Sequence, residues 1–356
     1  MAKVTLENVG HSYDSSSPEK DWPLKPISMS FEADRTYALV GPSGCGKTTM
    51  LNIISGIVAP KQGRIYFDDS DVTGLPTDKR NVAQVFQFPA IYRSMNVFDN
   101  LAFPLVCRSW EKERIKRRVG EVAEILGISD KLNRSAWRLG IDEKQLVSLG
   151  RGLVRDDVAV LLMDEPLTVI DPQLKFMLRK RIKEANDVLG STIIYVTHDQ
   201  YEAMTFAEEL LVMNAGSVIQ QGTPEQLFEA PVDDYVGYFI GSPAMNFLDA
   251  SVNAGMVHVE GVAIEVAQKN LPEGKVKVGI RPEYVSVASP VQPGVRVQIK
   301  SIQDQGNHRV VTCQLGNQVL KMKVPRSVQV ESSGELMIYL RPEKSLVYQD
   351  GKLLVN

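Results

Sequence analysis

The sequence predicts an α/β domain built around a buried sheet, followed by a smaller all-β domain. Over about the first 240 residues, short apolar runs mix with amphipathic helix-like segments, which is typical of an α/β domain. From about Pro243 onward, short alternating stretches are separated by Gly, Pro and Asn, which is typical of strands joined by turns. A length of 356 residues also favours two domains. We therefore expect domains at residues 1–240 and 241–356.

Composition narrows the possible functions. The chain is 44% hydrophobic and 23% charged, and its net charge of -3 supplies no broad positive field for nucleic acid. The longest apolar runs, such as Val158–Met163, are far shorter than the ~20 residues of a membrane-spanning helix. The N-terminus lacks a signal-peptide pattern, and Cys45, Cys107 and Cys313 are widely spaced. We expect a cytoplasmic protein with no nucleic-acid partner, disulfide framework or zinc site.

A phosphate-binding loop is the most specific motif. The β-like stretch Thr36–Val40 runs into a full match to G-x-x-x-x-G-K-S/T, and a helical run, Thr48–Ser55, follows. In this order, backbone N–H groups and the helix N-terminus face the phosphates of a nucleotide. Lys47 is expected to contact the β- and γ-phosphates, and the Thr48 hydroxyl to hold Mg²⁺. The expected ATP-binding residues of the loop are Gly41, Pro42, Ser43, Gly44, Cys45, Gly46, Lys47, Thr48 and Thr49.

Two further strands end in groups suited to hydrolysis. The apolar run Val158–Met163 leads into Asp164, which suits metal coordination, and Glu165, which suits a general base that polarises the attacking water. Thr192–Thr197 reads as another strand and delivers His198 at the edge where open α/β sheets bind ligands. There, His198 would reach the γ-phosphate. With the loop, these groups predict binding and hydrolysis of MgATP.

Together these residues resemble the nucleotide-binding subunits of ABC transporters, over essentially the whole chain. The resemblance implies a P-loop NTPase fold with a helical subdomain at about residues 88–152 and an ATPase activity. It places Tyr13 against the adenine ring, a use that its flat face allows; packing in the core is the alternative. It identifies Walker A at Gly41–Thr49, Walker B ending at Asp164, the Q-loop Gln87 near Mg²⁺ and the attacking water, the D-loop Asp171 at a dimer interface, and the switch histidine His198.

One motif departs from the family pattern. In the family, a Leu-Ser-Gly-Gly-Gln signature at a helix start clamps the γ-phosphate of ATP held by the opposing subunit. Here the aligned residues are Leu139, Gly140, Ile141, Asp142 and Glu143. Asp142 with Gln145 makes a plausible capping box, so the helix survives, but two carboxylates near a triphosphate repel it. We therefore expect a second ATPase subunit that is not identical to this chain.

The β-rich tail resembles the OB-like regulatory domain of ATPases that serve sugar, polyol and glycerol phosphate importers. Within it, Arg281-Pro282-Glu283 and Arg341-Pro342-Glu343 form a near-repeat after apolar strands. Two similar strand-to-turn exits are the alternative explanation, since Pro does not continue a central strand.

The same resemblance implies an importer with several partners. The stretch Ala83–Tyr92 and the altered signature most resemble bacterial glycerol importer ATPases, so glycerol is the expected solute, with sugars and glycerol phosphate as alternatives. The implied partners are two transmembrane permease subunits, docking around Phe88–Met95, and a periplasmic solute-binding protein. The chain would then act at the cytoplasmic face of the inner membrane. At Tyr92, a merely solvated loop is the alternative to docking.

Two other classes of function stay open. A non-transport ABC-type ATPase of DNA repair or translation usually carries coiled-coil insertions or tandem cassettes, and neither pattern is visible here. A regulatory protein that binds ATP without hydrolysing it is disfavoured by the presence of Glu165 and His198.

Overall fold

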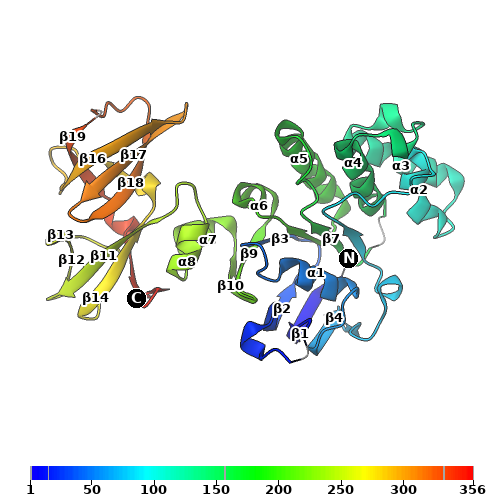
Figure 1. Ribbon diagram of the computed structural model, residues 1–356, viewed down its shortest axis with the longest axis horizontal. Coiled ribbons are helices and arrows are strands. Elements are labelled where there is room, and N and C mark those ends of the chain that lie inside the picture. The colour runs from blue at the N-terminus through cyan, green and yellow to red at the C-terminus, as the bar shows by residue number, and fades with distance from the viewer. Residues whose placement is uncertain (1, 15, 156–157, 332, 356) are drawn as a thin grey trace. The chain divides into compact units, whose positions relative to one another are not determined.

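In the computed structural model, which describes residues 2–14, 16–155, 158–331 and 333–355, the chain divides into two compact units, Met1–Pro224 and Glu225–Asn356 (Figure 1). The division precedes most of α7 (Pro224–Glu229) and all of α8 (Asp234–Phe239), whereas the sequence-based boundary at residue 240 lies after both helices. The buried Arg281 donates to the carbonyl oxygens of Phe228 (3.0 Å) and Gly237 (2.9 Å). These hydrogen bonds join both helices to the β-rich unit.

A six-stranded sheet in the order β10-β9-β3-β8-β7-β6 forms the centre of the first unit. Neighbouring strands pair in parallel, apart from the antiparallel pair β9 and β10. Every residue of β3, β7 and β8 is buried, which explains their continuous apolar sequences. The strands are β3 (Thr36–Val40), β6 (Ala83–Val85), β7 (Leu161–Asp164), β8 (Ile193–Val196), β9 (Glu209–Asn214) and β10 (Ser217–Gly222).

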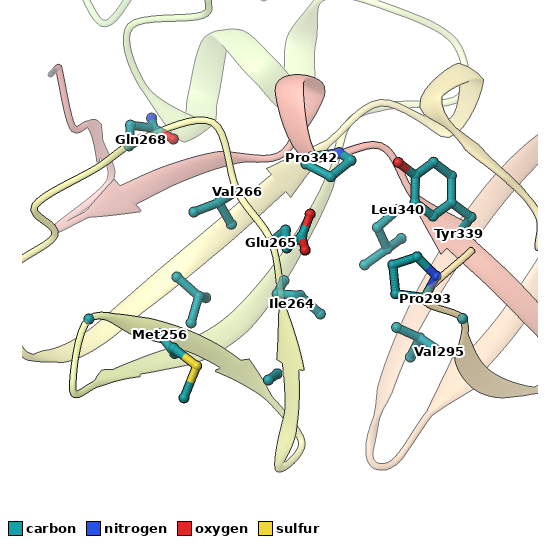
Figure 2. A pocket seen from close by; sticks show the side chains of 14 residues that line it. Met256, Ile264, Glu265, Val266, Gln268, Pro293, Val295, Tyr339, Leu340 and Pro342 are labelled. Atoms are coloured by element: carbon teal, nitrogen blue, oxygen red, sulfur yellow. The ribbon is translucent and has the colours of Figure 1, made fainter. Parts of the chain in front are cut away.

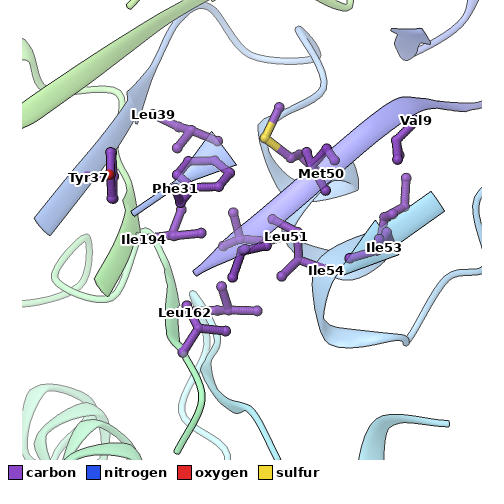
Figure 3. Packing of buried hydrophobic residues seen from close by; sticks show 14 of the residues in the cluster. Val9, Phe31, Tyr37, Leu39, Met50, Leu51, Ile53, Ile54, Leu162 and Ile194 are labelled. Atoms are coloured by element: carbon purple, nitrogen blue, oxygen red, sulfur yellow. The ribbon is translucent and has the colours of Figure 1, made fainter. Parts of the chain in front are cut away.

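A second, antiparallel sheet in the order β2-β1-β4-β5 packs on the other side of helix α1 (Lys47–Ser55). Figure 3 shows how Met50, Leu51 and Ile54 of α1 lie among buried side chains from both sheets, including Phe31 and Ile194. This burial fixes the helix whose N-terminus follows the glycine-rich loop. The strands are β1 (Val4–His11), β2 (Leu24–Phe31), β4 (Gln62–Phe67) and β5 (Ser70–Asp71).

Helices α2 (Val97–Val106), α3 (Lys112–Leu126) and α4 (Ile141–Leu153) pack against one another, within the stretch expected to form a helical subdomain. The helices α5 (Pro172–Leu189) and α6 (Gln200–Phe206) contact each other, and α6 contacts β3. Asn96, Asp171 and Asp199 precede α2, α5 and α6, and each side chain accepts a backbone N–H of the first turn. Among the described residues, no helix combines the length and apolar character needed to cross a bilayer.

The second unit contains two antiparallel sheets around a shared apolar core (Figure 1). One has the order β13-β12-β11-β14-β20-β21 and the other β15-β19-β16-β17-β18. The first sheet comprises β11 (Asn246–Asn253), β12 (Met256–Val259), β13 (Val262–Ile264), β14 (Gly274–Ile280), β20 (Leu346–Gln349) and β21 (Lys352–Leu353). The second comprises β15 (Val285–Val287), β16 (Val295–Asp304), β17 (His308–Leu315), β18 (Gln318–Pro325) and β19 (Gly334–Leu340).

The two Arg-Pro-Glu segments mark a structural repeat. Short 3₁₀ turns, Pro282–Tyr284 and Pro342–Lys344, join β14 to β15 and β19 to β20. The two halves exchange strands, because β14 pairs with β20 and β19 pairs with β15. Equivalent pairs, Gly279 with Leu346 and Tyr339 with Ser286, bear this out. The near-repeat is therefore more than two similar strand exits.

Candidate functional site

The glycine-rich loop between β3 and α1 has a backbone that requires glycine. Gly46 precedes α1 with φ 104°, and a Cβ there would lie 2.2 Å from the carbonyl oxygen of Pro23. A Cβ at Gly41 would lie 2.3 Å from the carbonyl oxygen of Met213. Any larger residue would push the loop away from β9 and from the chain before β2. The tight loop leaves the first N–H groups of α1 directed at its hollow, where an anion binds well.

The Lys47 side chain folds over the loop. Its Nζ donates to the carbonyl oxygens of Gly41 (2.8 Å) and Pro42 (2.9 Å) and lies 3.7 Å from the Cys45 sulfur. The ammonium group is therefore held over the loop next to the N-terminus of α1. A positive charge and helix N–H groups together favour a phosphate at this position. Cys45, one of the loop residues expected to bind ATP, is buried.

Thr48 and Asp164 meet beside the loop. The Thr48 hydroxyl donates to Asp164 Oδ1 at 3.2 Å, which joins the start of α1 to the end of β7. Burial raises the pKa of Asp164, the Thr48 hydrogen bond opposes this rise, and the charge of Glu165 adds to it. A hydroxyl and a carboxylate oxygen are hard ligands of the kind that Mg²⁺ prefers. A divalent cation there would favour the ionised carboxylate.

Glu165 is where the expected catalytic residues meet. Its Oε2 accepts hydrogen bonds from Gln87 Nε2 (3.3 Å) and the Thr168 hydroxyl (3.2 Å), and it lies 3.1 Å from His198 Nδ1. These residues come from four separate places in the sequence: the end of β6, the end of β7, the segment before α5 and the end of β8. Glu165 itself has φ 45°, an uncommon backbone conformation for a residue with a side chain.

Most of the expected site residues line one cavity of about 720 Å³. Tyr13 lies on it with 64% of the residue exposed, and its hydroxyl is 3.3 Å from the Thr49 hydroxyl. Such exposure excludes packing in the core as the reason for this tyrosine. Of the expected site residues, the cavity is lined by Tyr13, Ser43, Gly44, Gly46, Lys47, Thr48, Thr49, Gln87, Glu165 and His198.

Other expected residues lie outside this lining. The carbonyl oxygens of Gly41 and Pro42 accept hydrogen bonds from Lys47, and Asp164 accepts one from Thr48. Asp171 precedes α5, where its side chain accepts the Gln173 N–H at 2.9 Å. The altered signature, Leu139–Glu143, precedes and begins α4 and does not line the cavity.

The capping box expected from Asp142 and Gln145 is wrong. Gly140 precedes α4, and the Glu143 carboxylate accepts the Gly140 N–H at 3.0 Å and forms a 2.8 Å ion pair with Lys131. Gln145 lies one turn further in and is fully buried, so it is not available to cap. The Asp142 carboxylate folds back instead, with Oδ1 2.7 Å from where a Cβ of Gly140 would be.

Two positioning side chains were not found from the sequence. Gln145 Nε2 donates to the carbonyl oxygens of Phe86 and Pro166, both at 2.9 Å, and so fixes the residues next to Gln87 and Glu165. Glu202 accepts from the Tyr195 and Thr197 hydroxyls, both at 3.0 Å, and holds the strand that delivers His198. Their partners lie far away in sequence or on another element, so no local pattern marks them.

Comparisons with known proteins find relatives for both units. The family model described as ABC transporter matches residues 24–168, and the MalK OB fold domain model matches residues 241–285. Among solved structures, cbiO1 of Clostridium perfringens, part of an ABC transporter complex, has a TM-score of 0.57 and 27% identity. That comparison covers 64% of this chain and 90% of the other. A nucleotide-free ATP-binding cassette of an ABC transporter, at 24% identity and a TM-score of 0.53, shares the fold.

Curated relatives extend the similarity over nearly the full length. The oligosaccharides import ATP-binding protein MsmX of Bacillus subtilis is 35% identical, over 95% of each chain. The sn-glycerol-3-phosphate import ATP-binding proteins UgpC of Yersinia pseudotuberculosis and Escherichia coli O157:H7 are 36% and 35% identical, over 96% and 99% of each chain. With this similarity over both units, the chain belongs to the ATP-binding proteins of ABC importers, and it is an ATPase.

Proposed function

We propose that the chain binds MgATP in the cavity beside α1 and hydrolyses it to power uptake of a small polar solute. The observation that carries this proposal is the meeting of Gln87, Thr168 and His198 on one oxygen of Glu165. Glu165 acts as the general base on the attacking water, while Gln87 and His198 orient the water and the γ-phosphate. Tyr13 stacks on the adenine ring.

Thr48, Asp164 and Gln87 supply the oxygen ligands for magnesium in this proposal. Thr48 and Asp164 already lie within hydrogen-bonding distance of each other, and Gln87 donates to the neighbouring Glu165. When bound, Mg²⁺ neutralises charge on the β- and γ-phosphates. Lys47 and the N–H groups at the start of α1 hold the same phosphates from the loop side.

Replacing the proposed base tests this assignment. In the assembled transporter, Glu165→Gln keeps the shape of the side chain and an oxygen that accepts from Gln87 and Thr168, but it removes the base. Hydrolysis therefore falls at least about a hundredfold. Affinity for MgATP stays within a few-fold of the original. Thr168→Val is the matched control, because it removes one hydrogen bond to the same oxygen, and it lowers the rate by about tenfold or less. Undiminished hydrolysis by Glu165→Gln would exclude Glu165 as the base.

Glycerol is the proposed solute. The relatives named above serve oligosaccharides and sn-glycerol-3-phosphate, so sugars and glycerol phosphate are the alternatives. The stretch from Ala83 to Tyr92 and the altered signature carry the choice of glycerol, by resemblance. The test compares uptake of labelled glycerol, glycerol-3-phosphate and maltose in cells with and without the gene. Loss of glycerol uptake alone supports the proposal, and unchanged glycerol uptake contradicts it.

Two permease subunits are proposed to dock beside Tyr92, with a solute-binding protein on the other side of the membrane. The Tyr92 ring packs 4.5 Å from Phe103, and the Arg151 guanidinium lies 4.5 Å above it. The Tyr92 N–H donates to Asn100 at 2.8 Å. Such contacts make Tyr92 part of a packed surface, next to a hollow of about 240 Å³ lined by Phe86, Ala90, Pro104, Ser148 and Arg151, among others.

If permease subunits dock at Tyr92, a mutation there impairs transport without impairing nucleotide binding. Tyr92→Asp places a charge on the proposed contact, so uptake falls while MgATP affinity stays unchanged. Phe88→Asp is a useful companion, because Phe88 is 70% exposed and lies in the same expected docking stretch. Normal uptake by both variants would contradict this docking surface.

The proposed place of action is the cytoplasmic face of the inner membrane.

A non-identical second ATPase subunit is proposed to complete the transporter. The start of α4, which in the family binds ATP held by the opposing subunit, is occupied here by Asp142 and Glu143. The Glu143 carboxylate is fixed by Gly140 and Lys131, so it does not swing away. Two carboxylates at this place repel the γ-phosphate rather than bind it. One composite site, built from this chain's loop and a partner's intact signature, then does most of the hydrolysis.

Purification of the chain alone and with its partner ATPase tests this arrangement. The chain alone binds MgATP but hydrolyses it slowly, and the mixed assembly hydrolyses it at a normal rate. Rapid hydrolysis by the isolated chain as a homodimer would contradict the proposal.

A further inference from the structure

The β-rich unit contains a cavity of about 550 Å³ that the ATPase site does not use (Figure 2). Ile264, at the end of β13, and Glu265 and Val266, which follow it, lie on one side of the cavity. Pro293 and Leu340 lie on the other. The walls are mostly apolar, and the volume falls in the range of about 300 to 1,000 Å³ that small-molecule sites occupy.

Because the β-rich unit is a structural repeat, the position of this cavity has an equivalent in the other half of the unit. The pairs Val252–Val257 and Val257–Ile264, across β11, β12 and β13, correspond to Ile299–Cys313 and Cys313–Leu320, across β16, β17 and β18. The residue after Ile264 is Glu265, and the residue after Leu320 is Lys321. Glu265 and Lys321 are therefore equivalent positions.

In the other half, the equivalent place is closed by one side chain. Asn246, at the start of β11, donates through Nδ2 to the carbonyl oxygens of Lys321 (2.9 Å) and Ile280 (3.1 Å). Its Oδ1 accepts the Lys321 N–H at 2.7 Å. The carboxamide of Asn246 thus joins β18 to the end of β14, and its three hydrogen bonds use both of its donor hydrogens and its oxygen.

At the cavity, proline takes the place of this asparagine. Asn246 pairs with Ile280. Val295 pairs with Ile338, and continuing that antiparallel register by two residues sets Pro293 opposite Leu340. Proline has no carboxamide, so its side chain makes none of the three bonds, and it also lacks a backbone N–H. The seam between Glu265 and Leu340 consequently stays open and forms the cavity.

The backbone of Glu265 is directed at the open seam. The pair Val259–Val262 flanks a two-residue turn and is hydrogen-bonded in such hairpins, and bonded pairs then alternate along the strand. This alternation turns the N–H and C=O of Glu265 toward the free edge of β13, the last strand of its sheet. Within the described residues, no hydrogen bond or ion pair is made by Glu265.

We propose that this cavity binds a primary carboxamide carried on an apolar body. The ligand's NH₂ group donates to the carbonyl oxygens of Glu265 and Leu340, and its carbonyl oxygen accepts the Glu265 N–H. These are the bonds that the Asn246 side chain makes in the other half. The apolar body packs on Met256, Val266 and Pro342. A carboxylate ligand lacks the donors and is repelled by the Glu265 side chain.

Benzamide is the probe, and the full-length ¹⁵N-labelled chain is the protein. On titration, amide chemical shifts move saturably at residues 263–268, 293–295 and 339–342, with the millimolar affinity expected of a fragment of this size. Benzoate has nearly the same shape but lacks the NH₂ group, so it leaves these shifts unchanged. Equal responses to benzamide and benzoate, or no saturable response to benzamide at this cavity, would overturn the proposal.

Closing the seam from within gives a second test. Pro293→Asn supplies the missing carboxamide, so it raises the melting temperature of the β-rich unit by about 2 to 8 °C and abolishes the benzamide response. Met256→Trp fills the cavity and also abolishes the response, with Val319→Trp as the matched control, since Met256 and Val319 are 55% and 57% exposed. A benzamide response that survives both Pro293→Asn and Met256→Trp would overturn the assignment of this cavity.

Discussion

The surroundings of Glu165 show which residues of the site can be predicted from the sequence and which cannot. Glu165 and His198 each follow an apolar strand, so their convergence follows from the shared edge of a parallel sheet. Gln87, which follows β6, was expected there only by resemblance to the family. Thr168 and Gln145 contact the same region, yet no local pattern indicated these contacts, and Gln145 was expected to cap α4 instead. Their roles depend on which backbone carbonyls and carboxylates the folded chain brings near them.

Tyr13 carries a testable prediction at this scale. Its ring lies on the rim of the nucleotide cavity and is held by the Thr49 hydroxyl. Tyr13→Ala removes the stacking face and weakens ATP affinity by about 5- to 150-fold, the range for loss of base stacking. Tyr13→Phe keeps the face and loses the contact with Thr49, so affinity changes by a few-fold or less. Calorimetric titration with MgATP measures both, and equal affinities for all three proteins would contradict stacking.

At the scale of elements, the start of α4 shows where local rules were insufficient. Asp142 and Gln145 have the right spacing for a capping box, but the helix begins two residues earlier, after Gly140, and uses Glu143. Lys131, from a distant turn, stabilises that choice through its ion pair with Glu143. The capping partner was thus decided by a tertiary contact that the local sequence does not contain.

Restoring the family signature is the matching experiment. The combined change Gly140→Ser, Ile141→Gly, Asp142→Gly and Glu143→Gln removes both carboxylates and returns the hydroxyl and small residues. We expect the isolated chain to hydrolyse MgATP at least about tenfold faster, since oriented donors at a developing charge contribute this much or more. The same change combined with Glu165→Gln is the control and stays inactive. An unchanged rate in a well-folded protein would contradict the role given to this helix start.

The carbonyl oxygens at the C-terminal end of helix α1 accept hydrogen bonds from a residue outside the helix. The buried Arg80 donates to the carbonyl oxygens of Ile53 (2.7 Å), Ile54 (3.0 Å) and Thr73 (2.8 Å). Burial lowers the pKa of this guanidinium, but it stays protonated at neutral pH. Arg80→Met removes the guanidinium donors from these buried carbonyls and costs about 2 to 4 kcal/mol of unfolding free energy. Urea denaturation measures the loss, and Lys79→Met, an exposed neighbour, changes stability by less than about 0.5 kcal/mol.

At the scale of the whole molecule, the sequence predicted that there are two units but placed the boundary between them too late. The change from mixed to alternating texture near Pro243 located the β-rich unit but not its first helices. Helices α7 and α8 are assigned to that unit by contacts between distant residues, among them the bonds of the buried Arg281 and the pairs Lys344–Glu229 and Lys277–Asp234. The near-repeat was visible as two Arg-Pro-Glu segments, whereas the exchange of strands between the halves appears in the strand pairing.

The central claim is that the loop before α1 holds magnesium-bound ATP through Lys47 and Thr48, within reach of Glu165. The most direct measurement is the affinity of the purified full chain for ATP, with and without magnesium, before and after Lys47→Ala. We predict magnesium-dependent binding that weakens by about 10- to 150-fold in the variant, the effect of losing a charge-assisted phosphate contact. Binding that is indifferent to magnesium, or undiminished in Lys47→Ala, would contradict the account.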